Sequence, residues 1–173
     1  GIFIGTNGGF QALNADGTAR WFYNGGGFFR YASSALSNDG QLYALDWFGN
    51  LVALNAETGD MLWRHTLSSY DPVSPVIGHD GTIYVNDSGL AALSPEGEFL
   101  WRSLDSSSGY YGFITTPSIG ANNTIYLNGR DSLYAFAPDG TLDWTFQHGE
   151  SFATTPVISE QGTLYFSTSS HLF

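Results

Sequence analysis

The sequence contains no cysteine, which excludes a disulfide framework and any thiolate chemistry. It also contains no lysine: its five basic residues are all arginines, against sixteen acidic residues and a net charge of −11. Nucleic acids and anionic membranes are therefore poor partners, because their phosphates would be repelled rather than neutralised. The apolar runs are far too short for a membrane span, so we expect no membrane insertion.

Patterns typical of helices, metal sites and common catalytic sites are also missing. Apolar residues nowhere keep a helical spacing for three turns, so no helix is predicted. The sequence has no HExxH pattern, no calcium loop, no nucleophile elbow and no phosphate loop. The four histidines, none of which forms an HxH pair, are His65, His79, His148 and His171. We therefore expect no metal ion, no cofactor and no catalytic residue, and a role other than that of an enzyme is favoured.

The chain does contain a repeat with a period near forty residues. An aromatic residue in an apolar stretch recurs at intervals of 40, 41, 42 and 39 residues, at Phe3, Tyr43, Tyr84, Tyr126 and Tyr165. A tryptophan recurs at intervals of 42, 38 and 43 residues, at Trp21, Trp63, Trp101 and Trp144. A period of this length with several strands per unit indicates the blades of a β-propeller rather than a helical solenoid.

Each complete unit is predicted to contain four antiparallel strands, which we name A to D. In the second unit they are 33–37, 41–45, 50–55 and 60–64. Tight turns separate A from B at Asp39-Gly40 and C from D at Thr58-Gly59, where glycine tolerates positive φ. The fold class is therefore all-β: a β-propeller of four-stranded antiparallel blades with about four repeats. A single propeller domain, or a segment of one, is expected over 1–173, with repeats at 1–32 (which lacks strand A), 33–72, 73–113, 114–153 and 154–173 (which is incomplete).

The four tryptophans are predicted to be structural. An indole at the same place in each blade acts most simply as a wedge between neighbouring blades, so we expect Trp21, Trp63, Trp101 and Trp144 to be largely buried. The B strands are apolar on both faces, as expected for a sheet between two others.

The segment from Ala53 to Trp63, with Asn55 and Gly59 between them, resembles the tryptophan-docking motif of the pyrroloquinoline-quinone (PQQ) repeat family. The resemblance covers nearly the whole chain and implies a propeller in an extracytoplasmic (periplasmic or secreted) protein. The family includes PQQ-dependent dehydrogenases and the propeller lipoprotein of the outer-membrane protein assembly machinery. Its alcohol dehydrogenases hold the quinone with a vicinal disulfide, a calcium-binding Glu/Asn pair and a catalytic Asp; the disulfide is impossible here and the other ligands match no motif, so no PQQ is expected.

The B–C and D–A loops are predicted to emerge on the same face of the propeller, and they are rich in aromatic residues. These aromatics either pack over the blade edges or form a binding surface on a rigid scaffold. The candidate binding residues on this loop face are Trp47, Tyr70, Asp71, Tyr110, Tyr111, Arg130 and His148. A protein partner, a small ligand or a glycan would suit such a surface.

Three functions are compatible with these observations. A non-catalytic, extracytoplasmic scaffold for protein interaction or ligand binding is favoured, and the alternatives are a segment of a PQQ-dependent quinoprotein dehydrogenase and a carbohydrate-binding propeller. Residues 163–173 occupy the same repeat positions as residues 1–11, which does not suit a closed four-bladed ring. We therefore expect the chain to be a segment of a seven- or eight-bladed ring, or to associate with a second copy.

Overall fold

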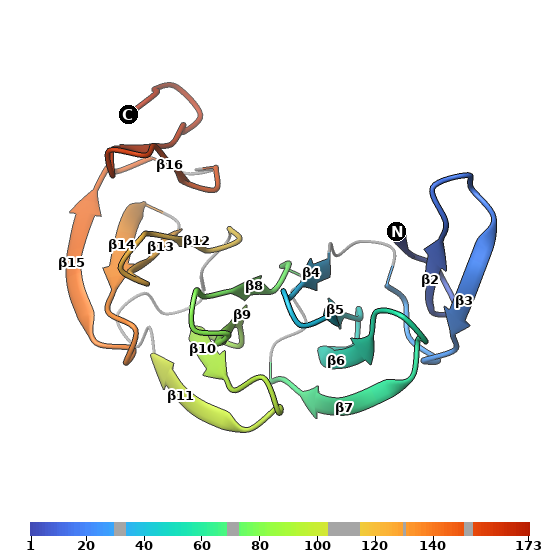
Figure 1. The fold of residues 1–173 in the computed structure, drawn as a ribbon. Helices are drawn as coiled ribbons and strands as arrows, with labels where there is room; N and C mark the ends of the chain where they lie inside the picture. Colours follow the sequence, from blue (N-terminus) through green and yellow to red (C-terminus); the bar gives the residue numbers. More distant parts are fainter. Residues whose placement is uncertain (30–33, 69–72, 104–114, 130, 151–153) are drawn as a thin grey trace. The chain divides into compact units, whose positions relative to one another are not determined.

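The computed structural model describes residues 1–29, 34–68, 73–103, 115–129, 131–150 and 154–173 (Figure 1). These residues form seventeen β-strands and no helix, which confirms the all-β prediction. The chain divides into two compact units, residues 1–75 and residues 76–173. Each unit is a stack of antiparallel sheets and is described on its own below.

The first unit contains one three-stranded and one four-stranded sheet, with strand orders β1-β2-β3 and β4-β5-β6-β7. The strands follow one another in the chain, so each sheet is a simple antiparallel meander. Their bounds are β1 Ile2–Gly5, β2 Phe10–Leu13, β3 Ala19–Tyr23, β4 Ser34–Leu36, β5 Gln41–Leu45, β6 Asn50–Asn55 and β7 Met61–Thr66.

The second unit contains two four-stranded meanders and a two-stranded hairpin, with orders β8-β9-β10-β11, β12-β13-β14-β15 and β16-β17. A described A strand is thus present in every sheet except that of β1. The bounds are β8 Val76–Ile77, β9 Ile83–Asn86, β10 Leu90–Leu93, β11 Phe99–Ser103, β12 Ser118–Ile119, β13 Ile125–Asn128, β14 Ser132–Phe136, β15 Leu142–Gln147, β16 Val157–Ile158 and β17 Leu164–Tyr165.

The inner strands of each blade form the core, as their apolar composition predicts. All residues of β9 and β10 are buried, as are all but the end residues of β5 and β6. The outer D strands β7, β11 and β15 are exposed or half-buried along their length. Burial on both faces of a B strand requires a sheet on each side, which is how propeller blades stack.

A β-bulge precedes each of the four tryptophans in its D strand. The pairing between the C and D strands shifts by one residue there, which leaves Arg20, Leu62, Leu100 and Asp143 as the extra residues. The residue opposite each tryptophan is a fully buried alanine of the C strand: Ala12, Ala53, Ala92 or Ala135. A bulge changes the direction in which a side chain points, and the small alanine leaves room for the indole. This geometry explains why the repeat needs alanine and tryptophan at this spacing.

Each indole rests on the B-strand aromatic of its own blade, with ring centroids 5.8–6.0 Å apart in all four blades. Two indoles also contact the next sheet within their unit: Trp21 Nε1 donates to the carbonyl of Ala56 (3.1 Å), and Trp101 Nε1 to that of Pro138 (3.0 Å). The expectation that the indoles are largely buried was wrong for Trp144, which is 42% exposed, whereas Trp21, Trp63 and Trp101 are half-buried. The rings lie at the outer edge of the sheets, where one side stays open to solvent.

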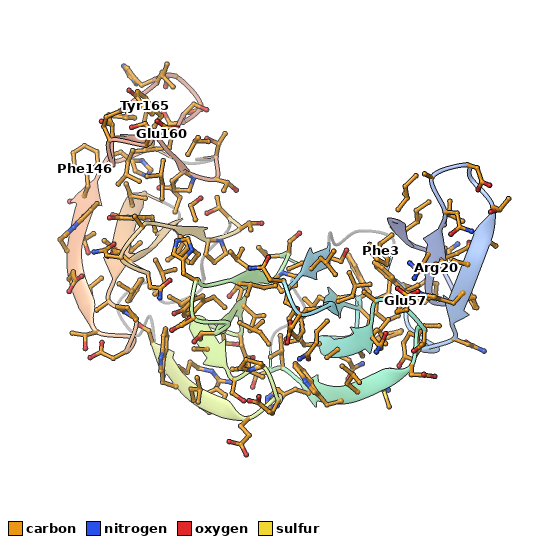
Figure 2. The ribbon with its side chains drawn as sticks, viewed as in Figure 1. Phe3, Arg20, Glu57, Phe146, Glu160 and Tyr165 are labelled. Carbon is orange, nitrogen blue, oxygen red and sulfur yellow. The ribbon has the colours of Figure 1, made fainter. Side chains whose placement is uncertain are left out.

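An ion pair lies beside the first of these contacts. Arg20, the bulge residue, binds Glu57 in the turn between β6 and β7, and Figure 2 shows the two side chains together. Hydrogen bonding to the Arg20 guanidinium lowers the pKa of Glu57 below its ordinary value. Because the Glu57 side chain is 80% exposed, solvent screens this pair and its contribution to stability is small.

Candidate protein-binding surface

The B–C and D–A loops adjoin each other within each unit. In the first unit, the N–H of Trp47 in a B–C loop donates to the carbonyl of Phe28 in a D–A loop (2.8 Å). In the second unit, the N–H groups of His148 and Gly149 donate to the carbonyl of Asp131 (2.9 Å each). Main-chain bonds between loops fix them relative to the sheets, so side chains at their tips are held in place.

The loops of the first unit carry three exposed aromatic side chains, and two of them are in contact. Phe28 is 42% exposed, and Trp47 and Phe48 are each 46% exposed. The rings of Phe28 and Phe48 lie 5.8 Å apart between centroids, tilted by 53°. We call these three residues the aromatic loop cluster. Large apolar side chains that stay in solvent on ordered loops indicate a place where another molecule binds.

Asp46 holds the loop that carries Trp47 and Phe48. Its carboxylate is almost fully buried, and it accepts hydrogen bonds from the N–H of Phe48 (2.9 Å), the N–H of Asn50 (2.8 Å) and the side-chain amide of Asn50 (2.8 Å). Three donors to a single carboxylate satisfy a charge that would be costly to bury alone. The aromatic residues at the loop tip therefore sit on a rigid base.

The D–A loop that carries Phe28 is anchored by its neighbour Phe29. The Phe29 ring is 1% exposed and packs edge-on against Phe10 and Tyr23, at 5.9 and 6.3 Å. Its N–H donates to the carbonyl of Thr6 (3.0 Å). Because successive residues of an extended chain point to opposite sides, burying Phe29 turns Phe28 outward beside Phe48.

The corresponding B–C loop of the third blade has a different character. It contains Ser88 and Gly89 where the second blade has Trp47 and Phe48. Asp87 at its start is fully buried and forms an ion pair with Arg102 of β11. This loop presents no large apolar side chain, so the described aromatic surface belongs to the second blade's loop and the loop before it.

His148, a candidate from the sequence, lies in the second unit and packs against aromatic rings. Its ring centroid is 5.6 Å from that of Phe166 and 6.2 Å from that of Phe173. Nδ1 accepts the N–H of Glu150 (3.3 Å), and Nε2 is buried without a hydrogen-bond partner among the described residues. His148 therefore acts, in this arrangement, as part of a packed cluster rather than as an exposed contact.

The carboxylate of Glu150 is tied to the last residues of the chain. The hydroxyls of Thr168 and Ser170 donate to it, and it contacts Nδ1 of His171. The Thr168 hydroxyl makes the largest contribution to lowering the pKa of Glu150 to about 2, with Ser170 and His171 adding to it. The carboxylate consequently stays charged throughout the physiological pH range.

The other predicted site residues cannot be compared with the structure. Tyr70, Asp71, Tyr110, Tyr111 and Arg130 lie outside the described residues. Trp47 and His148 belong to different units, so their position on a common face stays a prediction. Phe28 and Phe48 were visible in the sequence as loop aromatics, but nothing in the pattern distinguished them from the buried Phe29.

The described part of the chain shows no metal centre and no membrane-spanning helix. No three His, Asp or Glu residues gather there in a way that would hold a metal ion. No helix long and apolar enough to cross a membrane occurs among the same residues.

Comparison with known proteins identifies similar propellers. A family model described as "Outer membrane protein assembly factor BamB" matches residues 6–170. The chain is 26% identical over 124 residues to the outer membrane protein assembly factor BamB of Burkholderia pseudomallei, covering 69% of this chain and 31% of that protein. It is 39% identical over 70 residues to BamB of Yersinia pestis, covering 39% of this chain and 17% of that protein. The chain thus spans less than a third of the length of these curated relatives.

A solved structure shows the same fold. The crystal structure of BamB from Moraxella catarrhalis superposes with a TM-score of 0.80 at 22% sequence identity. The match covers 99% of this chain and 53% of that one. At this identity the superposition supports the β-propeller fold of stacked antiparallel blades and carries no further inference.

Proposed function

This chain belongs to the family of the outer membrane protein assembly factor BamB, and we propose that it is a non-catalytic, extracytoplasmic scaffold that binds a protein partner through its loops. The relatives it matches are named as assembly factors rather than as enzymes. The proposal rests chiefly on one observation, the aromatic loop cluster of Phe28, Trp47 and Phe48. Exposed aromatic residues on a rigid base are typical anchors of protein–protein interfaces.

The charge of the chain indicates which kind of partner can bind it. The three described arginines are all engaged: Arg20 with Glu57, Arg64 with the carbonyl of Gly25 (3.0 Å), and Arg102 with Asp87. The net charge is −11. A partner that presents neutral or basic polar groups around an apolar centre would complement this surface, whereas a polyanion would be repelled.

The two alternative functions have weaker support. A quinoprotein dehydrogenase of the alcohol-oxidising type needs a vicinal disulfide, and the chain has no cysteine. A carbohydrate-binding propeller would also use exposed aromatic rings, so Trp47 keeps this alternative open as a second candidate. A glycan array separates the two binding functions, because a lectin binds defined sugars and a protein scaffold does not.

The test measures the affinity of this chain for the outer membrane protein assembly machinery of Yersinia pestis. The BamB of Yersinia pestis is first removed from that machinery. Substitution of Trp47 by Ala should weaken binding by about 2 kcal/mol, or roughly 30-fold in Kd, if this residue is an anchor. Phe22→Ala is the matched control, because Phe22 is 53% exposed on β3 and lies outside the loops. Equal affinity of Trp47→Ala and wild type, or equal losses for Trp47→Ala and Phe22→Ala, would contradict the proposal.

A further inference from the structure

Three asparagines of the chain are followed directly by glycine, in the pairs Asn7-Gly8, Asn24-Gly25 and Asn128-Gly129. Asparagine is a thermolabile residue, and it loses its side-chain amide most readily when glycine follows it. The main-chain nitrogen of the glycine attacks the side-chain carbonyl carbon, and glycine has no side chain to hinder the approach. Both groups must be free to move, so the fold decides which of the three pairs reacts.

The fold restrains both reacting groups at Asn128. This residue is fully buried at the end of β13, and its side-chain amide donates to the carbonyl of Thr154 (2.7 Å). The N–H of Gly129 donates to the carbonyl of Ser132 (2.9 Å). The leaving amide and the attacking nitrogen are therefore both held in hydrogen bonds, and Asn128 should react slowly in the folded chain.

The fold restrains Asn7 more weakly. Asn7 is exposed, but it lies in the turn between β1 and β2, which is closed by a bond from the N–H of Thr6 to the carbonyl of Gly9 (2.9 Å). The Thr6 hydroxyl oxygen accepts the N–H of Gly9 at 3.2 Å and that of Gly8, the attacking nitrogen, at 3.4 Å. We therefore expect Asn7 to react at an intermediate rate.

Asn24 has neither kind of restraint. It is exposed and directly follows the last residue of β3. Among the described residues, neither its side chain nor the N–H of Gly25 forms a hydrogen bond. The Gly25 carbonyl accepts a bond from the Arg64 guanidinium (3.0 Å), but this oxygen takes no part in the attack. The positive charge of Arg64 also favours the deprotonated nitrogen that attacks.

The segment after Asn24 is packed too closely to absorb a change in its length. A Cβ built on Gly25 would lie 2.6 Å from the ring of Tyr23, and one built on Gly27 would lie 2.4 Å from the carboxylate of Asp46. The backbone of this glycine run therefore lies directly against side chains of β3 and of the neighbouring B–C loop. The exposed Phe28 follows this run, so its position depends on the length of the main chain before it.

We propose that Asn24 is the principal site of deamidation in this protein, and that the product displaces Phe28 from the aromatic loop cluster. The Gly25 nitrogen forms a bond to Asn24 Cγ and gives up its proton, while the Cγ–Nδ2 bond breaks and ammonia leaves. Water then opens the five-membered ring, chiefly to isoaspartate. Isoaspartate adds one carbon to the main chain before the closely packed glycine run, and its carboxylate adds a negative charge to a chain whose net charge is already −11.

Peptide mapping by mass spectrometry tests the site in the folded 173-residue chain. In warm, mildly alkaline buffer, Asn24 should deamidate at least about tenfold faster than Asn128, with Asn7 between them, because structured amides must first open. In urea the three rates should converge, since unfolding removes the hydrogen bonds that protect the other two pairs. Equal native rates at Asn24 and Asn128, a faster rate at Asn7 than at Asn24, or a ratio that persists in urea would overturn the proposal.

The effect on the loop is measured at a main-chain bond of the aromatic loop cluster. The N–H of Trp47 donates to the carbonyl of Phe28 (2.8 Å), so its hydrogen exchange should accelerate about tenfold once isoaspartate has formed. Asn24→Gln is the matched control, because its longer side chain resists ring closure, and its exchange should not change with age. Asn24→Asp adds the charge without the extra carbon and should accelerate exchange less. Equal exchange in fresh and aged wild type would contradict the displacement of Phe28.

The loss of binding rests on the proposed function and is tested separately. Aged wild type should bind the Yersinia pestis machinery, freed of its own BamB, about tenfold more weakly than fresh protein does, and aged Asn24→Gln should bind like fresh protein. If fresh wild type did not bind while Trp47 exchange still accelerated with age, the proposed function would fail and the deamidation site would stand. Unchanged affinity after ageing, where Trp47→Ala does reduce affinity, would contradict the link between Asn24 and the aromatic loop cluster.

Discussion

The B–C loops of the second and third blades begin with the same buried acid but satisfy it differently. Asp46 is held by N–H groups of its own loop and by Asn50, within a four-residue connection between β5 and β6. Asp87 is paired with Arg102 of the D strand, within a three-residue connection between β9 and β10. The longer connection closes on itself and has room for Trp47 and Phe48, whereas the shorter one relies on a neighbouring strand and has a small tip.

This difference shows how one blade scaffold supports both structural and binding loops. A buried acid that is satisfied locally leaves the D-strand arginine free for another partner: Arg64, at the position of Arg102, donates to the carbonyl of Gly25 in the adjoining D–A loop. That bond helps to hold the loop that carries Phe28. In the second blade the acid thus stabilises its own loop and the arginine stabilises the adjoining loop. In the third blade the acid and the arginine pair with each other instead.

Removal of the ion pair in the third blade should have the largest effect. Arg102→Ala removes the guanidinium that forms the ion pair with the fully buried Asp87 carboxylate, and we expect a loss of about 3 kcal/mol in the free energy of unfolding. Arg64→Ala is the matched control at the same repeat position, where the guanidinium bonds a neutral carbonyl, and should cost about 1 kcal/mol. Urea denaturation of both variants measures the difference, and equal losses would show that the two acids are satisfied in the same way.

Removal of the acid in the second blade should have the next largest effect. Asp46→Ala deletes the acceptor of three hydrogen bonds and leaves two backbone N–H groups of the loop without it, for an expected loss of about 2 kcal/mol. Asp46→Asn keeps one acceptor oxygen and should lose less. Hydrogen exchange of the Phe48 and Asn50 amides should accelerate in Asp46→Ala, and unchanged exchange would contradict the role we assign to Asp46.

Much of the fold could be predicted from the sequence, because repeated local patterns determine it. The predicted bounds 41–45 and 50–55 are those of β5 and β6. The predicted turn residues have positive φ, Asn123 at +62° among them, which takes the place that glycine fills in the other turns. The D-strand bulges could not be predicted, because a bulge depends on the pairing of two strands and not on one strand's composition.

The candidate surface was less predictable, because it depends on which side chain the fold turns outward. Phe28 and Phe29 are chemically identical neighbours, and only the packing of Phe29 against Phe10 and Tyr23 separates the exposed ring from the buried one. Arg64 and Arg102 follow their tryptophans at the same position, yet they bind a carbonyl and a carboxylate. Trp144 is more exposed than the other three indoles, although all four contact the B-strand aromatic of their own blade, so the D strand's own sequence does not determine this burial.

Substitutions that change the backbone strain in the two loops should have the smallest effects on stability, and the two effects should have opposite signs. Gly49 of the second blade has a φ of +78°, which glycine adopts without strain, whereas Ser88 of the third blade has a φ of +54° and carries a Cβ in the left-handed region. Gly49→Ala should therefore destabilise the chain by about 1 kcal/mol. Ser88→Gly relieves strain but increases the entropy of the unfolded chain, so it should stabilise by only about 0.3 kcal/mol.

The midpoints of urea denaturation for these two variants test whether the loops differ in backbone as well as in side chains. Gly49→Ala should also weaken partner binding, because a Cβ at a φ of +78° strains the loop that carries Trp47 and displaces the Gly49 carbonyl that accepts the N–H of Leu67 (2.7 Å). Ser88→Gly should leave binding unchanged, because its loop presents no aromatic side chain. If both substitutions shifted the midpoint in the same direction, the left-handed conformation of Ser88 would not be a source of strain, and the loops would differ in their side chains alone.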